Sequence, residues 1–421
     1  MTFSQRFRPL RVRLALLLAV VGPGIITANV DNDAGGITTY SVAGAHYGYS
    51  LLWMMPLVAL ALIIIQEMSA RLGIVTGKGL ADLIRESMGI RATAFILTVL
   101  VFANLANTVS EFAGVAASLE IFGISKYISV PLAAAVAWLL IVKANYRSVE
   151  RIFLLASALY LAYVASGFMA RPEWGAVAAA SVTPSFRFDA GYVTIFVTII
   201  GTTIAPWMQF YQQSSIIDKG LKITDMAYER LDVIIGSLFA VVVAAFITIA
   251  CAATLFTHGL TIETAKDAAV ALRPLAGTYA AALFALGLLN ASVFSAAVLP
   301  LSTAYVVCEA FGWEAGVSRN WREAPIFFII YTALIAVGAA IILLPIKSLV
   351  QTMLASQTLN GVLLPFVLIV MLRLVNDRRL MGRFVNGRLA NAVSWGMVVV
   401  LILLTVILVM ASVFPNLLGG G

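Results

Sequence analysis

Acidic side chains stand within or beside long apolar segments of this sequence, at Asp31, Asp33, Glu67 and Glu111. At the depth of a bilayer, a charged side chain costs roughly 3 kcal/mol. Glu67 has Arg71 one helical turn away, so a structural ion pair explains it. The other three have no Lys or Arg mid-segment to pair with, and an uncompensated buried carboxylate takes up a proton or holds a cation. The pattern indicates that the chain handles a cation.

Each of these three carboxyls has more than one interpretation. Asp33 is the first candidate for a metal ligand, because the glycines after it would expose carbonyls; alternatively, it caps the helix that resumes there. Asp31 either lines the access path or caps the chain locally. Glu111 is expected to be a carboxylate behind the ligands, a relay for cations or a protonated core residue.

The composition places these residues in a membrane. Hydrophobic residues make up 62% of the 421, charged residues 11%, and mean hydropathy is +1.00, whereas a soluble domain carries roughly a quarter charged residues. Apolar runs reach the roughly 20 residues that span a bilayer, and only helices satisfy the backbone within such a run. We predict an all-α domain with eleven transmembrane spans, at about 14–48 (interrupted), 50–71, 92–119, 127–144, 150–169, 192–217, 232–256, 278–311, 325–344, 348–374 and 389–414.

The basic residues follow these spans asymmetrically. Of the 27 Lys and Arg, 21 fall in the segments that would be cytoplasmic if the N-terminus is inside. This positive-inside bias predicts a plasma-membrane protein with a cytoplasmic N-terminus and an extracellular C-terminus. The net charge of +7 therefore reflects topology and does not indicate a nucleic-acid partner. The residues predicted to lie outside are Lys126, Arg171, Arg187, Lys266, Arg273 and Lys347.

Two of the spans are broken by helix-disrupting residues. The first contains paired glycines in Asp31–Gly36, and the sixth contains a glycine and a proline in Gly201–Trp207. Corresponding breaks five spans apart indicate an inverted-repeat transporter with its site between them. We expect one domain, 1–421, with a first repeat in 1–169, a second in 192–374 and a last span at 389–414.

Other chemistry is poorly supplied. Cys251 and Cys308 stand in apolar stretches without metal-ligand spacing, and His46 and His258 are the sole histidines. There is no GxxxxGK[ST], and no HExxH or GxSxG lies within a span. We expect no enzyme activity, no cofactor and no obligatory protein partner, only the metal substrate and the bilayer.

The motifs around the breaks resemble those of the NRAMP family of divalent metal transporters, over most of the chain. The matching segments are Gly22–Gly24, Asp33–Gly36, Ala43–Trp53, Ala70–Lys78 and, more weakly, Ser356-Gln357 with Leu364–Phe366. The resemblance implies a leucine-transporter-like 5+5 inverted repeat that holds the ion between broken spans 1 and 6.

Departures from the family pattern bear on the choice of metal. The family's Asp-Pro-Gly-Asn becomes Asp33-Ala-Gly-Gly36, which loses an Asn ligand, and the Met of its Met-Pro-His becomes Ala205. A thioether favours softer transition ions. What remains is oxygen, from Asp33, from carbonyls near Thr202 and Val30, and from Gln357. Mg²⁺ keeps several waters and suits such a site, so the chain resembles the NRAMP-related magnesium transporters, with Mn²⁺ expected to pass as well.

Other departures bear on proton movement. The family's span 6 histidines become Trp207 and Gln212, and its span 3 Asp-x-x-Glu becomes Thr108-x-x-Glu111. Histidine shuttles protons near neutral pH, so proton coupling is expected to be weak or absent. Trp207 either fills space or narrows the path for a hydrated ion. Gln212 belongs to a polar face that either lines the path or bonds neighbouring helices.

Two other transport functions stay open. One is a proton-coupled Mn²⁺/Fe²⁺ importer of the ordinary family type that has found other ligands. The other is an amino-acid transporter driven by Na⁺, although Asp33 would repel a substrate carboxylate and no nearby Lys or Arg compensates.

Overall fold

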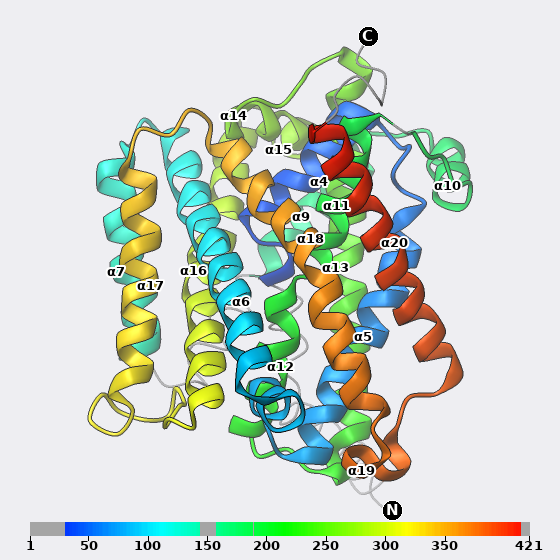
Figure 1. Ribbon diagram of the computed structural model, residues 1–421. Helices are drawn as coiled ribbons and strands as arrows, with labels where there is room; N and C mark the ends of the chain where they lie inside the picture. Colours follow the sequence, from blue (N-terminus) through cyan, green and yellow to red (C-terminus); the bar gives the residue numbers. More distant parts are fainter. Residues whose placement is uncertain (1–29, 144–156, 188, 414–421) are drawn as a thin grey trace, which may run out of the picture.

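The computed structural model describes residues 30–143, 157–187 and 189–413, and within them the chain forms helices and no strands. The helices, shown in Figure 1, are α4 (Ala34–Tyr47), α5 (Met54–Thr76), α6 (Leu80–Glu120), α7 (Lys126–Val142), η1 (Ser157–Tyr160), α9 (Leu161–Met169), α10 (Trp174–Val182), α11 (Ala190–Thr203), α12 (Pro206–Asp218), η2 (Ile223–Asp225), α13 (Met226–Thr254), η3 (Phe256–His258), α14 (Ala265–Ala268), η4 (Ala269–Leu272), α15 (Arg273–Ala276), η5 (Gly277–Tyr279), α16 (Ala280–Phe311), α17 (Pro325–Leu343), α18 (Leu349–Asn376), α19 (Arg378–Met381), η6 (Gly382–Phe384) and α20 (Arg388–Val413).

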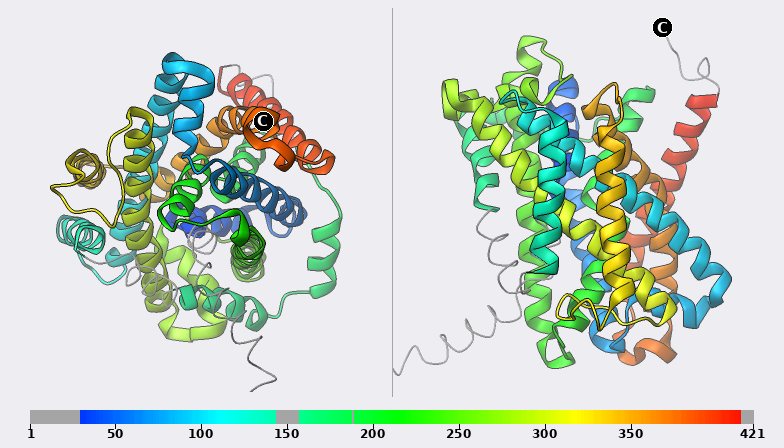
Figure 2. Two further views of the ribbon diagram at one scale, coloured as in Figure 1. Left: turned by 90° about the horizontal axis from the view of Figure 1, so that it is seen from below. Right: turned by 90° about the vertical axis from the view of Figure 1, so that its left-hand side faces the viewer.

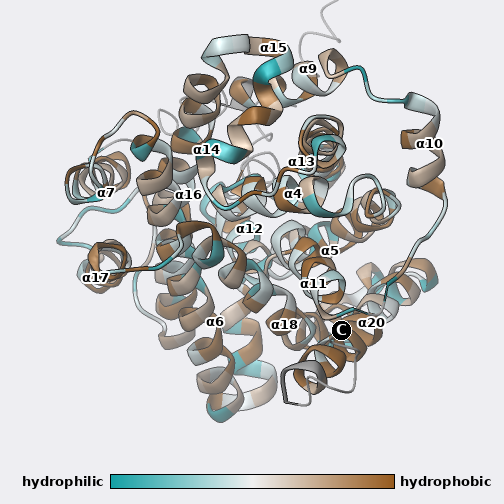
Figure 3. Cartoon of the chain, turned by 90° about the horizontal axis from the view of Figure 1, so that it is seen from above, coloured by the Kyte–Doolittle hydropathy of each residue, from teal (hydrophilic) through white to brown (hydrophobic). Residues whose placement is uncertain are grey.

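The outer surface of the bundle is apolar. Large hydrophobic side chains such as Phe95, Phe102 and Leu132 are more than 60% exposed, and Figure 3 shows brown outer faces on many helices. In the described part of the chain, eight helical segments are long and apolar enough to cross a membrane. Water would not tolerate so much exposed apolar surface, whereas lipid does. The prediction of a polytopic helical membrane protein is confirmed.

The predicted spans agree with the helices at most ends and differ most in the second, which runs from Met54 to Thr76 rather than over 50–71, and in the seventh. A helical segment begins at Leu80, but Gly89 (φ 78°, ψ 172°) is non-helical and separates it from the helix that follows, which starts close to the predicted beginning of the third span at 92. The seventh begins at Met226 rather than at 232. The predicted positions 14–29 and 150–156 lie outside the described residues, and the division into two repeats stays a prediction.

Helices α4, α11 and α12 occupy the middle of the bundle. α4 packs against α13 and α18, α11 against α18, and α12 against α5 and α16; the views of Figure 2 and Figure 3 show α4 and α12 surrounded by the other helices. Glycine permits the closest of these contacts, because a Cβ at Gly201 would overlap the backbone of Gly361 and of Gln357. The broken segments are therefore enclosed by continuous helices.

The end of α12 remote from its break is bonded to α16. Ser214 donates a hydrogen bond to the Glu309 carboxylate, and the Tyr305 hydroxyl donates to the Asp218 carboxylate. These two bonds attach the last turns of α12 to the last turns of α16.

The same end of the bundle carries the ion pair predicted for Glu67. Arg71 lies 3.0 Å from the Glu67 carboxylate, which also pairs with Arg230 of α13 at 2.9 Å. Arg71 further donates to the carbonyl of Phe384 and the side chain of Asn386. Glu67 is thus a structural residue, as predicted.

Candidate functional site

The break before α4 is organised by Asp33. Asp33 has extended backbone (ψ −176°) and is the N-cap of α4, and its carboxylate accepts a hydrogen bond from the Gly36 N–H at 2.6 Å. The carboxylate is 4% exposed and lies at the positive end of the α4 dipole. The capping role proposed as an alternative is therefore present. The hydrogen bond from Gly36 uses one lone pair of the Asp33 carboxylate, and other lone pairs remain for a cation.

The break between α11 and α12 lies opposite. α11 ends at Thr203, Ile204 departs from helical geometry (φ −127°, ψ 63°), and α12 starts at Pro206. Because Pro206 has no N–H, the carbonyl of Thr202 cannot receive the usual helical hydrogen bond. A linker of two residues thus leaves polar backbone open in the middle of the bundle.

Oxygen atoms from both breaks converge at Gly36. A Cβ added there would lie 2.5 Å from the Asp31 carbonyl, 3.2 Å from Thr202 Oγ1 and 3.4 Å from Asp33 Oδ1. Thr202 Oγ1 is buried and has no hydrogen-bond partner among the described residues, while the neighbouring Thr203 Oγ1 bonds Ile199 and the Tyr40 hydroxyl. A buried hydroxyl without a partner is costly. Three oxygens therefore lie close together beside Gly36, and oxygen atoms are the ligands that a hard cation prefers.

Gln357 of α18 reaches Asp33 from the other side. Its Nε2 lies 3.3 and 3.4 Å from the two carboxylate oxygens, as a donor. Its Oε1 accepts from Asn360, and Asn360 exchanges two hydrogen bonds of 3.0 Å with Asn107 of α6. This amide chain fixes the orientation of Gln357, so in this arrangement it holds Asp33 and presents no oxygen to the site.

Glu111 and Asp31 flank the same point. Glu111 is fully buried; its Oε2 accepts from the Ala34 N–H at 3.2 Å, and its Oε1 has no partner among the described residues. Both carboxylate oxygens of Asp31 are likewise buried and without a described partner. The carboxyls of Asp33 and Glu111 therefore meet at the N-terminus of α4, and neither they nor the nearby Asp31 are bonded to a cationic side chain in the described structure.

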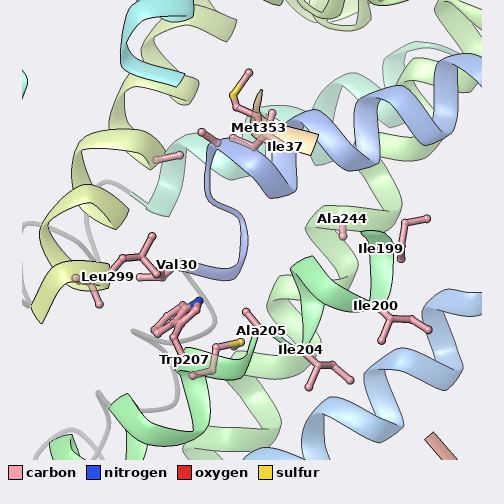
Figure 4. Packing of buried hydrophobic residues seen from close by; sticks show 14 of the residues in the cluster. Val30, Ile37, Ile199, Ile200, Ile204, Ala205, Trp207, Ala244, Leu299 and Met353 are labelled. Carbon is pink, nitrogen blue, oxygen red and sulfur yellow. The ribbon is translucent and has the colours of Figure 1, made fainter. Parts of the chain in front are cut away.

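Ala205 and Trp207 lie at the start of α12. Ala205 is 3% exposed, and its methyl group replaces the sulfur that a methionine would bring. In the view of Figure 4, the Trp207 indole points toward the segment that carries Val30; the side chain is 2% exposed and fills the core beside the break. Trp207 thus takes space near the site, and a role in narrowing the path for a hydrated ion stays a prediction.

Gln212 is not brought to Asp33. It lies six residues along α12, where its Nε2 is 3.4 Å from Glu229 of α13. Glu229 and Asp232 are also buried, although the sequence alone did not indicate that these two acidic residues lie inside the bundle. The signal was missed because their charges lowered the hydropathy of a segment that is in fact the first two turns of α13.

Asn107 and Asn360 were also missed. Their signal was available, because polar side chains in the middle of apolar spans usually bond to one another or to the pathway.

Within the described ranges, no three His, Cys, Asp or Glu side chains form a metal-binding group. The candidate ligands are instead a mixed set of carboxylate, hydroxyl and backbone oxygens.

Comparison of the sequence with protein families finds one that matches along nearly the whole chain. Residues 24–411 match the family described as natural resistance-associated macrophage protein-like, Nramp. A divalent metal cation transporter, MntH, of Ralstonia nicotianae is 30% identical over 403 residues, covering 90% of this chain and 88% of its own. The protein of the same name from Bacillus subtilis is 28% identical over 407 residues, covering 93% and 92%.

Solved structures of similar fold extend the comparison. A manganese transporter of Eremococcus coleocola superposes with a TM-score of 0.76 at 22% identity, covering 95% of this chain and 88% of its own. Mhp1, a nucleobase-cation-symport-1 transporter, superposes with a TM-score of 0.59 at 15% identity, covering 93% and 90%. The leucine-transporter-like fold that we predicted is confirmed. The family match along residues 24–411 makes the chain a member of the NRAMP family of divalent metal transporters.

Proposed function

We propose that this transporter carries hard divalent cations, Mg²⁺ and also Mn²⁺, between the breaks of spans 1 and 6, without proton coupling. The observation that carries the proposal is the convergence of Asp33 Oδ1, Thr202 Oγ1 and the Asp31 carbonyl around Gly36. These are oxygen ligands on one carboxylate anchor, with waters completing the shell of an ion that dehydrates reluctantly. Gln357 and Glu111 orient the site through their bonds to Asp33 and Ala34.

The side chain at position 205 supports the preference for hard ions. Ala205 is the N-cap of α12 at the break and offers no sulfur. A thioether there would strengthen the binding of Mn²⁺, Cd²⁺ and softer ions relative to the binding of Mg²⁺. Its absence leaves charge and hydration as the main grounds for selection.

The histidines support uncoupled transport. His46 is exposed in the last turn of α4 and His258 is exposed in η3, so neither lies at the breaks. The membrane potential supplies about 2.3 kcal/mol per charge per 100 mV, which is enough to drive a divalent cation inward. This driving force acts on uptake if the N-terminus is cytoplasmic in the plasma membrane, as the distribution of Lys and Arg indicates.

Proton-coupled manganese import is the second candidate, and the comparisons favour it. The solved structures of similar fold include a manganese transporter, and the relatives described above are named MntH. On this reading, the buried Glu111 and Asp31 carboxyls would carry the proton. The two candidates differ in cargo preference and in whether uptake acidifies the interior.

A flux assay separates them. Proteoliposomes are loaded with a Mg²⁺ indicator and, in parallel, with a pH indicator. We expect saturable Mg²⁺ entry without acidification, with Mn²⁺ competing. Mn²⁺ entry that acidifies the lumen, with no Mg²⁺ entry, would establish the second candidate.

Asp33→Asn tests the anchor. Asn caps a helix about as well as Asp, so the α4 cap should persist while uptake is abolished. Asp189→Asn is the matched control, because Asp189 caps α11 by accepting from the Tyr192 N–H at 2.8 Å. Full uptake by Asp33→Asn would refute the site assignment.

Ala205→Met tests the softness argument. The thioether is expected to strengthen inhibition of Mg²⁺ uptake by Cd²⁺ and Mn²⁺, measured as a lower inhibitory concentration. Ala205→Leu fills similar space without sulfur and should not show this shift. Equal inhibition in the two variants would show that volume, and not the thioether, matters at this position.

A further inference from the structure

A lipid-facing groove runs along the seam between α6 and α18 and is not part of the proposed ion path. The groove has a volume of about 800 Å³ and lies where the end of α17 meets these two helices. Its lining is mostly apolar and includes Phe102, Leu105, Val109, Ile341, Ala355 and Leu359. In a bilayer such a groove is filled by hydrocarbon, because water gains no partners on an apolar wall.

A separate and much smaller hollow, of about 10 Å³, lies further along the same two helices. It is lined by Phe95 and Val99 of α6, by Leu363 and Phe366 of α18 and by Pro206, the first residue of α12. Phe95 and Phe366 are 61% and 52% exposed, so the seam is open to the lipid side. Stripes at i, i+3 and i+4 on each helix form its two walls.

The groove is positively charged at the end where α18 begins. Lys347 lines it, is exposed, and has no hydrogen bond or ion pair with the described residues. Ser348 beside it caps α18, whose first N–H groups point to the same place. Lys126 lies close by, with its ammonium bonded to the carbonyls of Ile342 and Leu344. The lining contains no acidic side chain.

We propose that this groove is a binding site for an anionic phospholipid. An acyl chain lies along the α6/α18 seam, and the phosphate meets Lys347 and the N-terminus of α18. A net negative headgroup is favoured over a zwitterionic one, because the quaternary ammonium of a choline would meet the lysines. The occupant has consequences for transport, since α18 carries Gln357 and α6 carries Glu111 and Asn107.

Native mass spectrometry of the purified full chain tests the site without measuring transport, so its failure is separate from failure of the proposed function. The probes are phosphatidylglycerol and phosphatidylcholine of the same acyl chains. We expect one phosphatidylglycerol retained in preference to phosphatidylcholine. Lys347→Gln should weaken its retention on the order of fivefold, the contribution of one lysine at an anionic surface. Lys266→Gln is the matched control, because Lys266 is exposed on α14 at the same end of the bundle (Figure 1).

A second variant tests the apolar half of the site while keeping the charge. Ala355→Phe fills the groove and should displace the lipid, whereas Ala336→Phe, on the exposed side of α17, should not. Equal retention of the two lipids, or unchanged retention in both Lys347→Gln and Ala355→Phe, would overturn the proposal. So would a doubled mass that Ala355→Phe abolishes, since a second copy of the chain would then cover the groove.

Discussion

Replacing Thr202 by valine is expected to stabilise the fold and weaken cation binding at once. Valine has the shape of threonine, and Thr202 Oγ1 is buried without a partner among the described residues. Removing such a hydroxyl relieves a penalty of roughly 1–3 kcal/mol. If the hydroxyl is a cation ligand, its loss costs about 1.5–3 kcal/mol of binding, by analogy with hydrogen bonds to charged groups, or roughly 10- to 150-fold in Kd.

The adjacent residue supplies the control. Thr203 Oγ1 bonds the Ile199 carbonyl and the Tyr40 hydroxyl, each at 2.7 Å. Thr203→Val leaves the buried tyrosine hydroxyl without that partner and is expected to cost about 1–3 kcal/mol of stability, with cation affinity little changed. The two substitutions are at adjacent positions, and they are expected to change the stability in opposite directions.

Thermal unfolding in detergent, with and without Mg²⁺, measures both quantities in one experiment. Thr202→Val should raise the unfolding temperature without the ion and reduce the upward shift that Mg²⁺ produces. A Thr202→Val chain that unfolds earlier, like Thr203→Val, and keeps the full Mg²⁺ shift would refute the role of this hydroxyl as a ligand.

Two further substitutions test the surroundings of the site. Gly36→Asn restores the family's residue but would place a Cβ 2.5 Å from the Asp31 carbonyl. We expect the stability to fall by about 1–3 kcal/mol from overpacking and Mg²⁺ uptake to slow. Unchanged uptake and unfolding would contradict the close approach of these oxygens to Gly36. Asn360→Leu removes the hydrogen bonds that fix Asn107 and Gln357. We expect a loss of stability of about 1–3 kcal/mol and weaker inhibition of Mn²⁺ uptake by Mg²⁺. Wild-type values for both would show that these amide bonds do not orient the site.

The fold could be predicted because hydropathy and breaks are local properties of the sequence. The breaks at Asp33 and Pro206 are visible from glycine and proline alone, and the structure places both in the centre of the bundle. Family motifs at the same positions supported the leucine-transporter-like arrangement. The charged segment that starts at Leu80 was left out of the third span by hydropathy, and in the structure Gly89 separates it from the helix that follows, just before the predicted start at 92.

The site was predicted in part, for a physical reason. Asp33 stands out as a charge at a break, but the carbonyl of Asp31 and the hydroxyl of Thr202 become neighbours only through the packing of α4 against α11. The donor role of Gln357 depends on Asn360, one turn away, and on Asn107, from another helix. Such bonds depend on helix rotation and depth, which residue types do not specify.

The two-residue link between α11 and α12 limits how the second half of span 6 can move. Ile204 and Ala205 allow α12 to tilt about its first residue but leave no slack for it to slide. α12 has 13 residues and is about 20 Å long, so a tilt of about 10° displaces its far end by about 3 Å. That lever motion exceeds the reach of a hydrogen bond, so the Ser214–Glu309 and Asp218–Tyr305 bonds must part before α12 swings. These two bonds therefore oppose the tilt of α12 at the end of the helix that is farthest from the proposed cation site.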